Sequence, residues 1–318
     1  QALAQRGSDH ESVVLASAKG WQWPLLQVDM RLQSLSAVFS MFEGKSKAQA
    51  EEASALDAAD SSGGLKSPTC NKEQSEVESS PLTGAQLTEV MDDVSRRVKD
   101  WEQGGFTLVK QLQEAVRNHG RVELMRSPAS EGSKLVAVKR MPTKWVRNSP
   151  SEFAEYYPAA SERPWYDIGI VRKLNLVGFP YACTLMGVFR DQDTTFVASS
   201  LATEGDLFGW CDRDPPPGLA REEIMQPLVG QMFSAVRWLH NLGIAHRDLS
   251  LENILLTDTG SDGLQVKVID FGMASLTQKV RREVRGKQSY QAPEMHMEPE
   301  YDTFLADIFA LGVVLFAM

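Results

Sequence analysis

Two short stretches in the second half of the chain carry polar side chains that could act together on a charged substrate. Residues 246–253 hold Asp248 and Asn253, and Asp270 opens an Asp-Phe-Gly turn further along. An aspartate in a loop of this kind can accept a proton from a hydroxyl group. A carboxylate and an amide oxygen also suit a hard cation such as Mg2+. The order and spacing therefore indicate phosphoryl transfer from ATP.

These stretches resemble the motifs of the eukaryotic protein kinases. The family's catalytic loop is H-R-D-L-x-x-x-N, matched by residues 246–253, and its metal-binding turn is D-F-G, matched by residues 270–272. The family's A-P-E motif follows at residues 292–294. The resemblance implies a Ser/Thr-type protein kinase that uses ATP and Mg2+ and takes a protein substrate bearing Ser or Thr. It makes the loop aspartate the base, and the asparagine and the turn aspartate the metal ligands.

Three segments upstream are rich in β-branched and aliphatic residues and are separated by turn residues. They predict antiparallel strands over 106–112, 121–125 and 134–140. The third strand ends in Val-Ala-Val-Lys, which is similar to the family's V-A-I-K strand. The resemblance therefore implies that Lys139 holds the α- and β-phosphates of the nucleotide.

The family also pairs this lysine with an acidic residue on the next helix. Asp167 stands at the position of the family's glutamate, and Glu162 is the alternative. Aspartate is shorter by one methylene group, roughly 1.5 Å of reach, so the helix must lie closer to Lys139. We expect Ser161 to cap this helix and Pro164 to lie in its first turn.

Further positions of the resemblance surround the nucleotide. The family's loop over the phosphates is G-x-G-x-x-G-x-V, whereas this chain has Ala115, Arg117 and Gly120 at the glycine positions. Glycines let backbone amides approach phosphate closely, so we expect a stiffer lid and weaker ATP binding. Arg117 either compensates with its guanidinium or is an exposed arginine at a strand edge. The positions implied for the adenine pocket and its hinge are Val122, Ala137, Ser199, Leu201 and Leu255.

Two residues depart from the Ser/Thr pattern together. Ser250 stands where the family has a lysine that contacts the transferred phosphate, and Lys287 stands where it has a threonine in the activation segment. We predict an exchange, in which Lys287 supplies positive charge at the γ-phosphate and Ser250 is its hydrogen-bond partner. Two independent tolerated changes are the alternative. By the same resemblance, Arg247 meets a phosphorylated activation segment.

The elements that position these residues predict an α+β, two-lobed protein-kinase-like fold. We expect a small lobe of antiparallel sheet plus a helix over 105–202, and a larger, mostly helical lobe over 203–318. A helix over 221–242 should deliver the catalytic loop. Its inward residues are predicted to be Ile224, Leu228, Ala235, Val236 and Leu239.

The resemblance also implies a buried helix in the large lobe whose aspartate, Asp307, anchors the catalytic loop. The chain ends inside this helix at Met318. We therefore expect the large lobe to be incomplete and to leave apolar surface bare.

Residues 1–104 have a different character and are predicted to form an N-terminal extension. An apolar stripe predicts an amphipathic helix over 25–42, which docks on the protein's own surface, on a partner or on a membrane surface. Residues 43–85 have few large apolar groups and are predicted to be a disordered linker. A second stripe predicts a helix over 86–103 that packs against the following lobe.

Composition bounds the remaining possibilities. The 318 residues carry a net charge of −9, which argues against a nucleic-acid surface. Three cysteines without metal-ligand spacing indicate a reducing compartment, and we expect a cytoplasmic protein without disulfides. No apolar run is long enough for a transmembrane segment, and no signal peptide is visible, although Gln1 in place of Met leaves a preceding segment open.

Two other classes of function stay open. The glycine-poor lid, Asp167 and Ser250 would also suit a pseudokinase or nucleotide-binding scaffold. A decoy or interaction fragment with one incomplete lobe would fold poorly and show no magnesium-dependent thermal shift with ATP.

Overall fold

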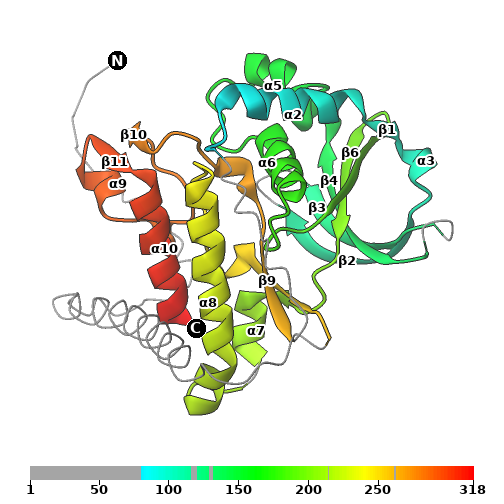
Figure 1. Ribbon diagram of the computed structural model, residues 1–318. Helices are drawn as coiled ribbons and strands as arrows, with labels where there is room; N and C mark the ends of the chain where they lie inside the picture. Colours follow the sequence, from blue (N-terminus) through cyan, green and yellow to red (C-terminus); the bar gives the residue numbers. More distant parts are fainter. Residues whose placement is uncertain (1–79, 116–119, 129–131, 214, 261–262) are drawn as a thin grey trace, which may run out of the picture. The chain divides into compact units, whose positions relative to one another are not determined.

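The computed structural model describes residues 80–115, 120–128, 132–213, 215–260 and 263–318. These residues belong to one compact unit, drawn in colour in Figure 1. The predicted helix over 25–42, and the predicted linker up to residue 79, lie outside the described residues. Of the helices in the described part of the chain, none combines the length and the apolar character that a membrane crossing requires.

A six-stranded sheet forms the small lobe (Figure 1). The strands lie in the order β1-β5-β6-β4-β3-β2, and all neighbours are antiparallel except β1 and β5. Their bounds are β1 Lys99–Asp100, β2 Thr107–Ala115, β3 Gly120–Arg126, β4 Leu135–Pro142, β5 Leu185–Arg190 and β6 Thr194–Ser200. The three strands predicted between residues 106 and 140 are confirmed as β2, β3 and β4. Alternation along β4 buries Val136 and Val138, so that Ala137 and Lys139 lie on its other face.

Helix α6, Pro164–Leu176, packs beside this sheet and carries Asp167. Pro164 opens its first turn as predicted, but the N-cap residue is Arg163. The predicted cap at Ser161 is therefore wrong. The backbone N–H of Arg163 donates to the carbonyl oxygen of Gly272 at 2.9 Å, which sets where the chain enters the helix. Two short helices precede it, α4 Thr143–Val146 and α5 Pro150–Tyr156.

Residues 80–104 contact both lobes, and most of them pack on the small one. The predicted disordered linker over 43–85 is therefore wrong at its end, because Leu82 is buried and α2 begins at Gly84. Helix α2, Gly84–Arg96, begins at a capping box in which Thr83 and Gln86 satisfy each other's backbone N–H groups. The predicted helix over 86–103 is confirmed over 86–96, and α2 packs against the following lobe as expected. Its predicted extension beyond Arg96 is wrong, because β1 and the short helix α3, Trp101–Gly104, follow α2. Trp101 stacks on Phe196 of β6 with ring centroids 3.8 Å apart, so its apolar surface is buried on the sheet rather than in a helical stripe.

Helices dominate the large lobe, as predicted. Its helices are α7 Leu207–Arg213, α8 Leu219–Asn241, α9 Glu294–Met297 and α10 Thr303–Ala317, with 3-10 turns at Leu251–Asn253, Phe271–Met273 and Gln288–Tyr290. Its short strands are β7 Gly205–Asp206, β8 Ile254–Asp258, β9 Leu264–Val268, β10 Lys279–Arg281 and β11 Glu300–Asp302. In α8, Met225 and Met232 are buried, whereas Ile224 is 42% exposed. The inward assignment of Ile224 is therefore wrong, since the neighbouring Met225 faces the core instead.

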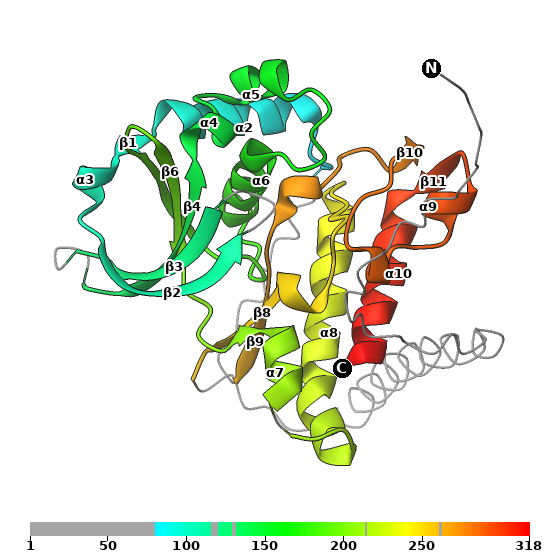
Figure 2. The same cartoon turned by 180° about the vertical axis from the view of Figure 1, so that it is seen from behind.

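Helix α10 lies alongside α8 in both views (Figures 1 and 2). Its inner face buries Ala310, Leu311 and Val314. Its outer face exposes Leu305 and Phe316, at 63% and 88% of their surfaces. The apolar surface expected on this helix is therefore present.

Candidate active site

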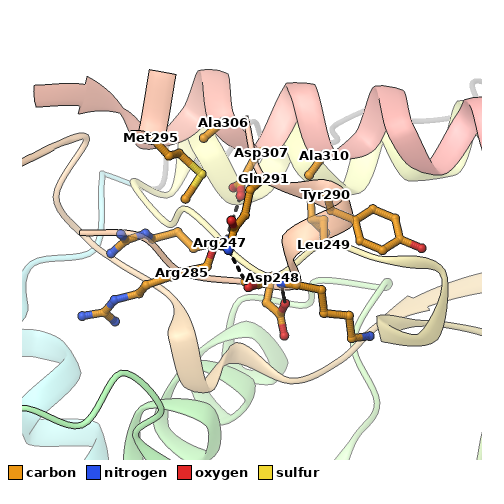
Figure 3. A pocket seen from close by; sticks show the side chains of 12 residues that line it. Arg247, Asp248, Leu249, Arg285, Tyr290, Gln291, Met295, Ala306, Asp307 and Ala310 are labelled. Atoms are coloured by element: carbon orange, nitrogen blue, oxygen red, sulfur yellow. Dashed lines mark hydrogen bonds between the residues drawn. The ribbon is translucent and has the colours of Figure 1, made fainter. Parts of the chain in front are cut away.

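A buried carboxylate on α10 holds the start of the catalytic loop. Asp307 is 1% exposed, and its two oxygens accept the backbone N–H groups of His246 and Arg247, each at 2.7 Å. Figure 3 shows Asp307 beside Arg247. His240, near the end of α8, lies 3.0 Å from the same carboxylate. Arg247 has a positive φ of 65°, a backbone conformation that is unfavourable for a residue other than glycine. Its hydrogen bond to Asp307 helps to stabilise this conformation. The anchoring role that the resemblance implied for Asp307 agrees with these contacts.

Asp248 projects from this loop and is itself fixed from two sides. Its Oδ1 accepts the backbone N–H of Lys287 at 3.0 Å, and its Oδ2 accepts the side-chain amide of Asn253 at 3.1 Å. The same amide donates to the Asp248 carbonyl oxygen at 2.7 Å. Because its nitrogen is occupied in this way, Asn253 keeps its amide oxygen as an acceptor.

Gly286 lets the activation segment approach this loop. It has a φ of +84°, and a Cβ placed there would lie 2.7 Å from the carbonyl oxygen of Arg247 and 3.4 Å from Asp248 Oδ1. Only glycine fits such a backbone and such a spacing.

Lys139 lies between two acidic side chains. Its Nζ is 3.6 Å from Asp167 Oδ2 on α6 and 3.9 Å from Asp270 Oδ1 in the Asp-Phe-Gly turn. Asp167 also accepts the backbone N–H of Phe271 through Oδ1 at 2.9 Å. Asp167 is thus the residue that pairs with the strand lysine. Glu162, the alternative, is buried beside Gly272 and adds negative charge near Lys139.

The acidic side chains around Lys139 keep its ammonium group charged. Burial alone would lower the pKa of Lys139. The charges of Asp270, Asp167 and Glu162 outweigh burial and raise this pKa above the ordinary lysine value. An ammonium group held between carboxylates is suited to phosphate oxygens.

Asp270 and Asn253 have the donor chemistry expected of a magnesium site. One offers a carboxylate and the other an amide oxygen, and both belong to segments fixed by backbone hydrogen bonds, since Ile269 N–H donates to Asn253 O at 3.0 Å. Asp270 has a left-handed φ of 66°. Among the described residues, no group of three or more His, Cys, Asp or Glu side chains could enclose a metal ion.

The positions implied for the adenine pocket come from both lobes. Ala137 pairs with Ser199 across β4 and β6, and Val122 pairs with Lys139 across β3 and β4. Leu255 comes from β8 of the large lobe, and Leu201 directly follows β6. All five side chains are half-buried, unlike the fully buried core residues beside them in the strands.

Only part of the loop that was predicted to cover the phosphates belongs to the described residues. Ala115 pairs with Gly120 at the end of the β2–β3 hairpin, whereas Arg117 lies outside the described residues. A Cβ at Gly120 would overlap the carbonyl oxygen of Arg140. Gly120 is therefore required by the packing of β3 on β4, whatever its part in binding phosphate.

Lys287 and Ser250 are in direct contact. Lys287 Nζ donates to Ser250 Oγ at 2.7 Å, which is the hydrogen bond that the exchange predicted. The same Nζ lies 3.0 Å from Glu252 Oε2, a partner that the sequence analysis missed. Burial alone would raise the pKa of Glu252, but hydrogen bonds from its own backbone, Lys287 and Ser250 hold this pKa below its ordinary value. The Lys287 ammonium is therefore already paired in this structure.

The activation segment carries its own acidic partner for Arg247. Arg247 Nη1 donates to Glu283 Oε2 at 2.9 Å, and Arg285 Nη2 lies 3.1 Å from the same oxygen. Tyr301 donates its hydroxyl to the Glu283 carbonyl oxygen. Burial alone would raise the pKa of Glu283, but its hydrogen bond from Arg247 and the charges of Arg285, Arg247 and Arg163 lower it. Glu283 was not predictable from the sequence, because nothing in its local pattern points to a buried arginine.

Comparison with known proteins places the chain in a family. A sequence profile described as the protein kinase domain matches residues 119–318, well over half of the chain. This chain belongs to the protein kinase family. The match begins one residue before β3. It covers β4 with Lys139, the catalytic loop and the Asp-Phe-Gly turn.

Similar curated proteins include protein kinases of mouse and of plants. Testis-specific serine/threonine-protein kinase 5 of Mus musculus is 37% identical over 141 residues, which is 42% of this chain and 37% of that protein. CBL-interacting protein kinase 31 of rice, Oryza sativa subsp. japonica, is 33% identical over 150 residues, or 46% of this chain and 32% of that protein. CBL-interacting serine/threonine-protein kinase 17 of Arabidopsis thaliana is 31% identical over 153 residues, or 46% of this chain and 34% of that protein. The chain spans about a third of the length of these relatives.

Proposed function

We propose that this chain is a protein serine/threonine kinase that transfers the γ-phosphoryl group of ATP to Ser or Thr hydroxyls of protein substrates. The observation that carries the proposal is the position of Lys139 between Asp167 and Asp270. An ion pair between the sheet and α6, next to the metal-binding turn, is the arrangement that phosphoryl transfer requires in this family. The names of the similar proteins support Ser/Thr as the acceptor.

In the proposed reaction each polar residue has a separate task. Asp248 accepts the proton of the substrate hydroxyl, and its two side-chain hydrogen bonds keep it oriented toward that group. Lys139 binds the α- and β-phosphates. Asn253 and Asp270 would hold Mg2+, which would supply positive charge to offset the negative charge of the nucleotide's phosphates.

Lys287 would supply positive charge at the γ-phosphate. The contact with Ser250 positions its ammonium near the loop, and Glu252 competes for that ammonium. We infer that a bound γ-phosphate draws Lys287 away from Glu252, whose carboxylate is 43% exposed and is readily solvated when released.

Autophosphorylation with labelled ATP tests the proposal. Lys139→Met removes the phosphate-binding charge and Asp270→Asn removes a metal-binding charge, so each should reduce incorporation by roughly 100-fold or more. Lys134→Met, an exposed lysine at the other end of the same β3–β4 hairpin, is the matched control and should leave incorporation within about twofold. Incorporation that neither active-site substitution changes would exclude these catalytic assignments.

A nucleotide-binding scaffold is the second candidate. The replacement of two lid glycines by Ala115 and Arg117, and the pairing of Lys287 with Glu252, both favour it. This candidate predicts that MgATP raises the melting temperature while no phosphate is transferred to protein. Binding without transfer in the wild-type chain would select it over the kinase.

A further inference from the structure

Residues 81–96, which we call the linking segment, contact both lobes. The backbone N–H of Leu82 donates to the carbonyl oxygen of Leu242 at 2.8 Å. A Cβ on Gly243 would lie 3.3 Å from Pro81, so the segment lies directly on the end of α8. The catalytic loop begins three residues later, at His246. The start of the linking segment is thus fixed to the helix that delivers that loop.

The rest of the linking segment, helix α2, packs on α6. Leu87 and Met91 are 1% and 5% exposed, and α2 lies over α6 in both views (Figures 1 and 2). Gly169 of α6 makes this approach possible. A Cβ there would overlap Met91 Cγ and lie 3.1 Å from Leu87 Cδ1. A glycine inside a helix otherwise costs stability, so its presence here is explained by the close contact with α2.

Asp167 lies two residues before Gly169 on the same helix, and its contacts depend on where α6 lies. Its carboxylate spans 3.6 Å to Lys139 and 2.9 Å to the backbone N–H of Phe271. Because aspartate is shorter than glutamate by one methylene group, roughly 1.5 Å, an outward movement of α6 by that amount would break both contacts. The contacts of Asp167 therefore require that α6 is kept close to the sheet.

We propose that the linking segment is a positioning element that presses α6 toward the sheet and so allows an aspartate to reach Lys139. Leu87 and Met91 are its positioning residues, and Gly169 is the site on α6 that receives them. This role rests on the proposed kinase function and identifies what sets the geometry of its Lys139–Asp167 pair. The bond from Leu82 to Leu242 ties the same element to the base of the catalytic loop.

Melting temperatures test the docking without any need for activity. Gly169→Ala should lower Tm by roughly 3 °C or more, because the new methyl group collides with Met91. Gly230→Ala in α8, where nothing lies within 4 Å of the added atom, is the matched control. There the better helix propensity of alanine should raise Tm by roughly 1–3 °C. The double variant Gly169→Ala/Met91→Ala should recover part of the loss. If Gly169→Ala also raises Tm, α2 is not docked and the proposal fails.

Hydrogen exchange at the Phe271 amide tests the positioning, again without activity. This N–H donates to Asp167, so Leu87→Ala/Met91→Ala should speed its exchange roughly tenfold or more. Adding Asp167→Glu should restore protection, because the longer side chain spans the extra distance. Protection that is unchanged by the double alanine variant, or not restored by glutamate, would show that α2 only stabilises the fold.

Kinetics then connect this result to the proposed function. In the double alanine background, Asp167→Glu should raise kcat/KM for ATP threefold or more, whereas in the wild-type background it should give no gain. Equal effects in both backgrounds would mean additivity and would overturn the positioning role. A wild-type chain with no transfer activity would refute the kinase function, while the melting and exchange measurements would still decide the role of the linking segment.

Discussion

At the scale of single residues, the paired change of Ser250 and Lys287 is the most specific feature of this site. Each residue alone would weaken a kinase, since one removes an ammonium group and the other removes a hydroxyl. Their hydrogen bond of 2.7 Å joins the two positions across the catalytic loop and the activation segment. The contact makes an exchange of roles physically reasonable, because the same charge and the same hydroxyl remain in the same small volume.

A double-mutant cycle tests the exchange. Ser250→Lys places two ammonium groups together and Lys287→Thr leaves none, so each single variant should lower kcat roughly tenfold. The double variant restores one of each group and should recover most of the activity, which corresponds to a coupling of about 2 kcal/mol. Steady-state kcat of all four proteins checks this result. Effects that simply add would favour two independent tolerated changes.

At the scale of elements, the activation segment is held by a carboxylate of its own. Glu283 receives Arg247 from the catalytic loop and Arg285 from its own segment, while Arg163 at the start of α6 adds to the positive field. These groups join the small lobe, the loop and the activation segment at one point. The Glu283 carboxylate therefore balances part of the positive charge of these three arginines.

Glu283 should therefore contribute stability that depends on pH. Its folded-state pKa is lowered, so the contribution is present at neutral pH and is lost as pH falls below the ordinary glutamate value toward the folded-state pKa. Glu283→Gln should cost about 1–2 kcal/mol at pH 7, less than a fully buried pair because this carboxylate is 43% exposed.

Urea unfolding at pH 7 and at more acidic pH values measures the effect. The difference between wild type and Glu283→Gln should shrink as the solution becomes acidic. Glu300→Gln, at the exposed Arg281–Glu300 pair, is the control and should change stability by only a few tenths of a kcal/mol. A difference that stays constant with pH would contradict the assignment of the effect to the Glu283 charge.

At the scale of the whole molecule, long-range hydrogen bonds align the lobes and the loop. Asp307 orients His246 and Arg247, which lie about sixty positions earlier in the sequence. Leu82 reaches forward to the end of α8. The catalytic loop is thus anchored directly by α10, and the end of α8 that precedes it is bonded to Leu82.

Asp307 should accordingly be needed for both stability and catalysis. Asp307→Ala leaves two buried backbone N–H groups without their acceptor, at a cost of about 2–4 kcal/mol. Asp307→Asn keeps one acceptor oxygen and should cost less, while still lowering kcat by misaligning Asp248. Thermal unfolding and kcat of both variants test this expectation. An alanine variant as stable and as active as wild type would show that the loop is held in other ways.

Much of the candidate site was predictable from the sequence, because most of its polar residues lie in short, contiguous motifs. Asp248, Asn253, Asp270 and Lys139 were predicted from the motifs around them. Strands β2, β3 and β4 were predicted from their β-branched and aliphatic residues between turn residues. The errors concern longer-range choices. The predicted cap at Ser161, the extension of the helix over 86–103 beyond Arg96 and the inward side of Ile224 failed because local patterns cannot weigh a competing tertiary contact.

The sequence by itself determined the family, the two-lobed architecture and the polar residues proposed for catalysis, since these depend on residue types at fixed short spacing. Only the tertiary structure decided which residues meet across long stretches of chain. It revealed the pairing of Lys287 with Glu252, the seating of Arg247 on Glu283 and the packing of α2 at Gly169. The physical reason is that charge pairing and close packing depend on distance in space, which a linear pattern does not encode.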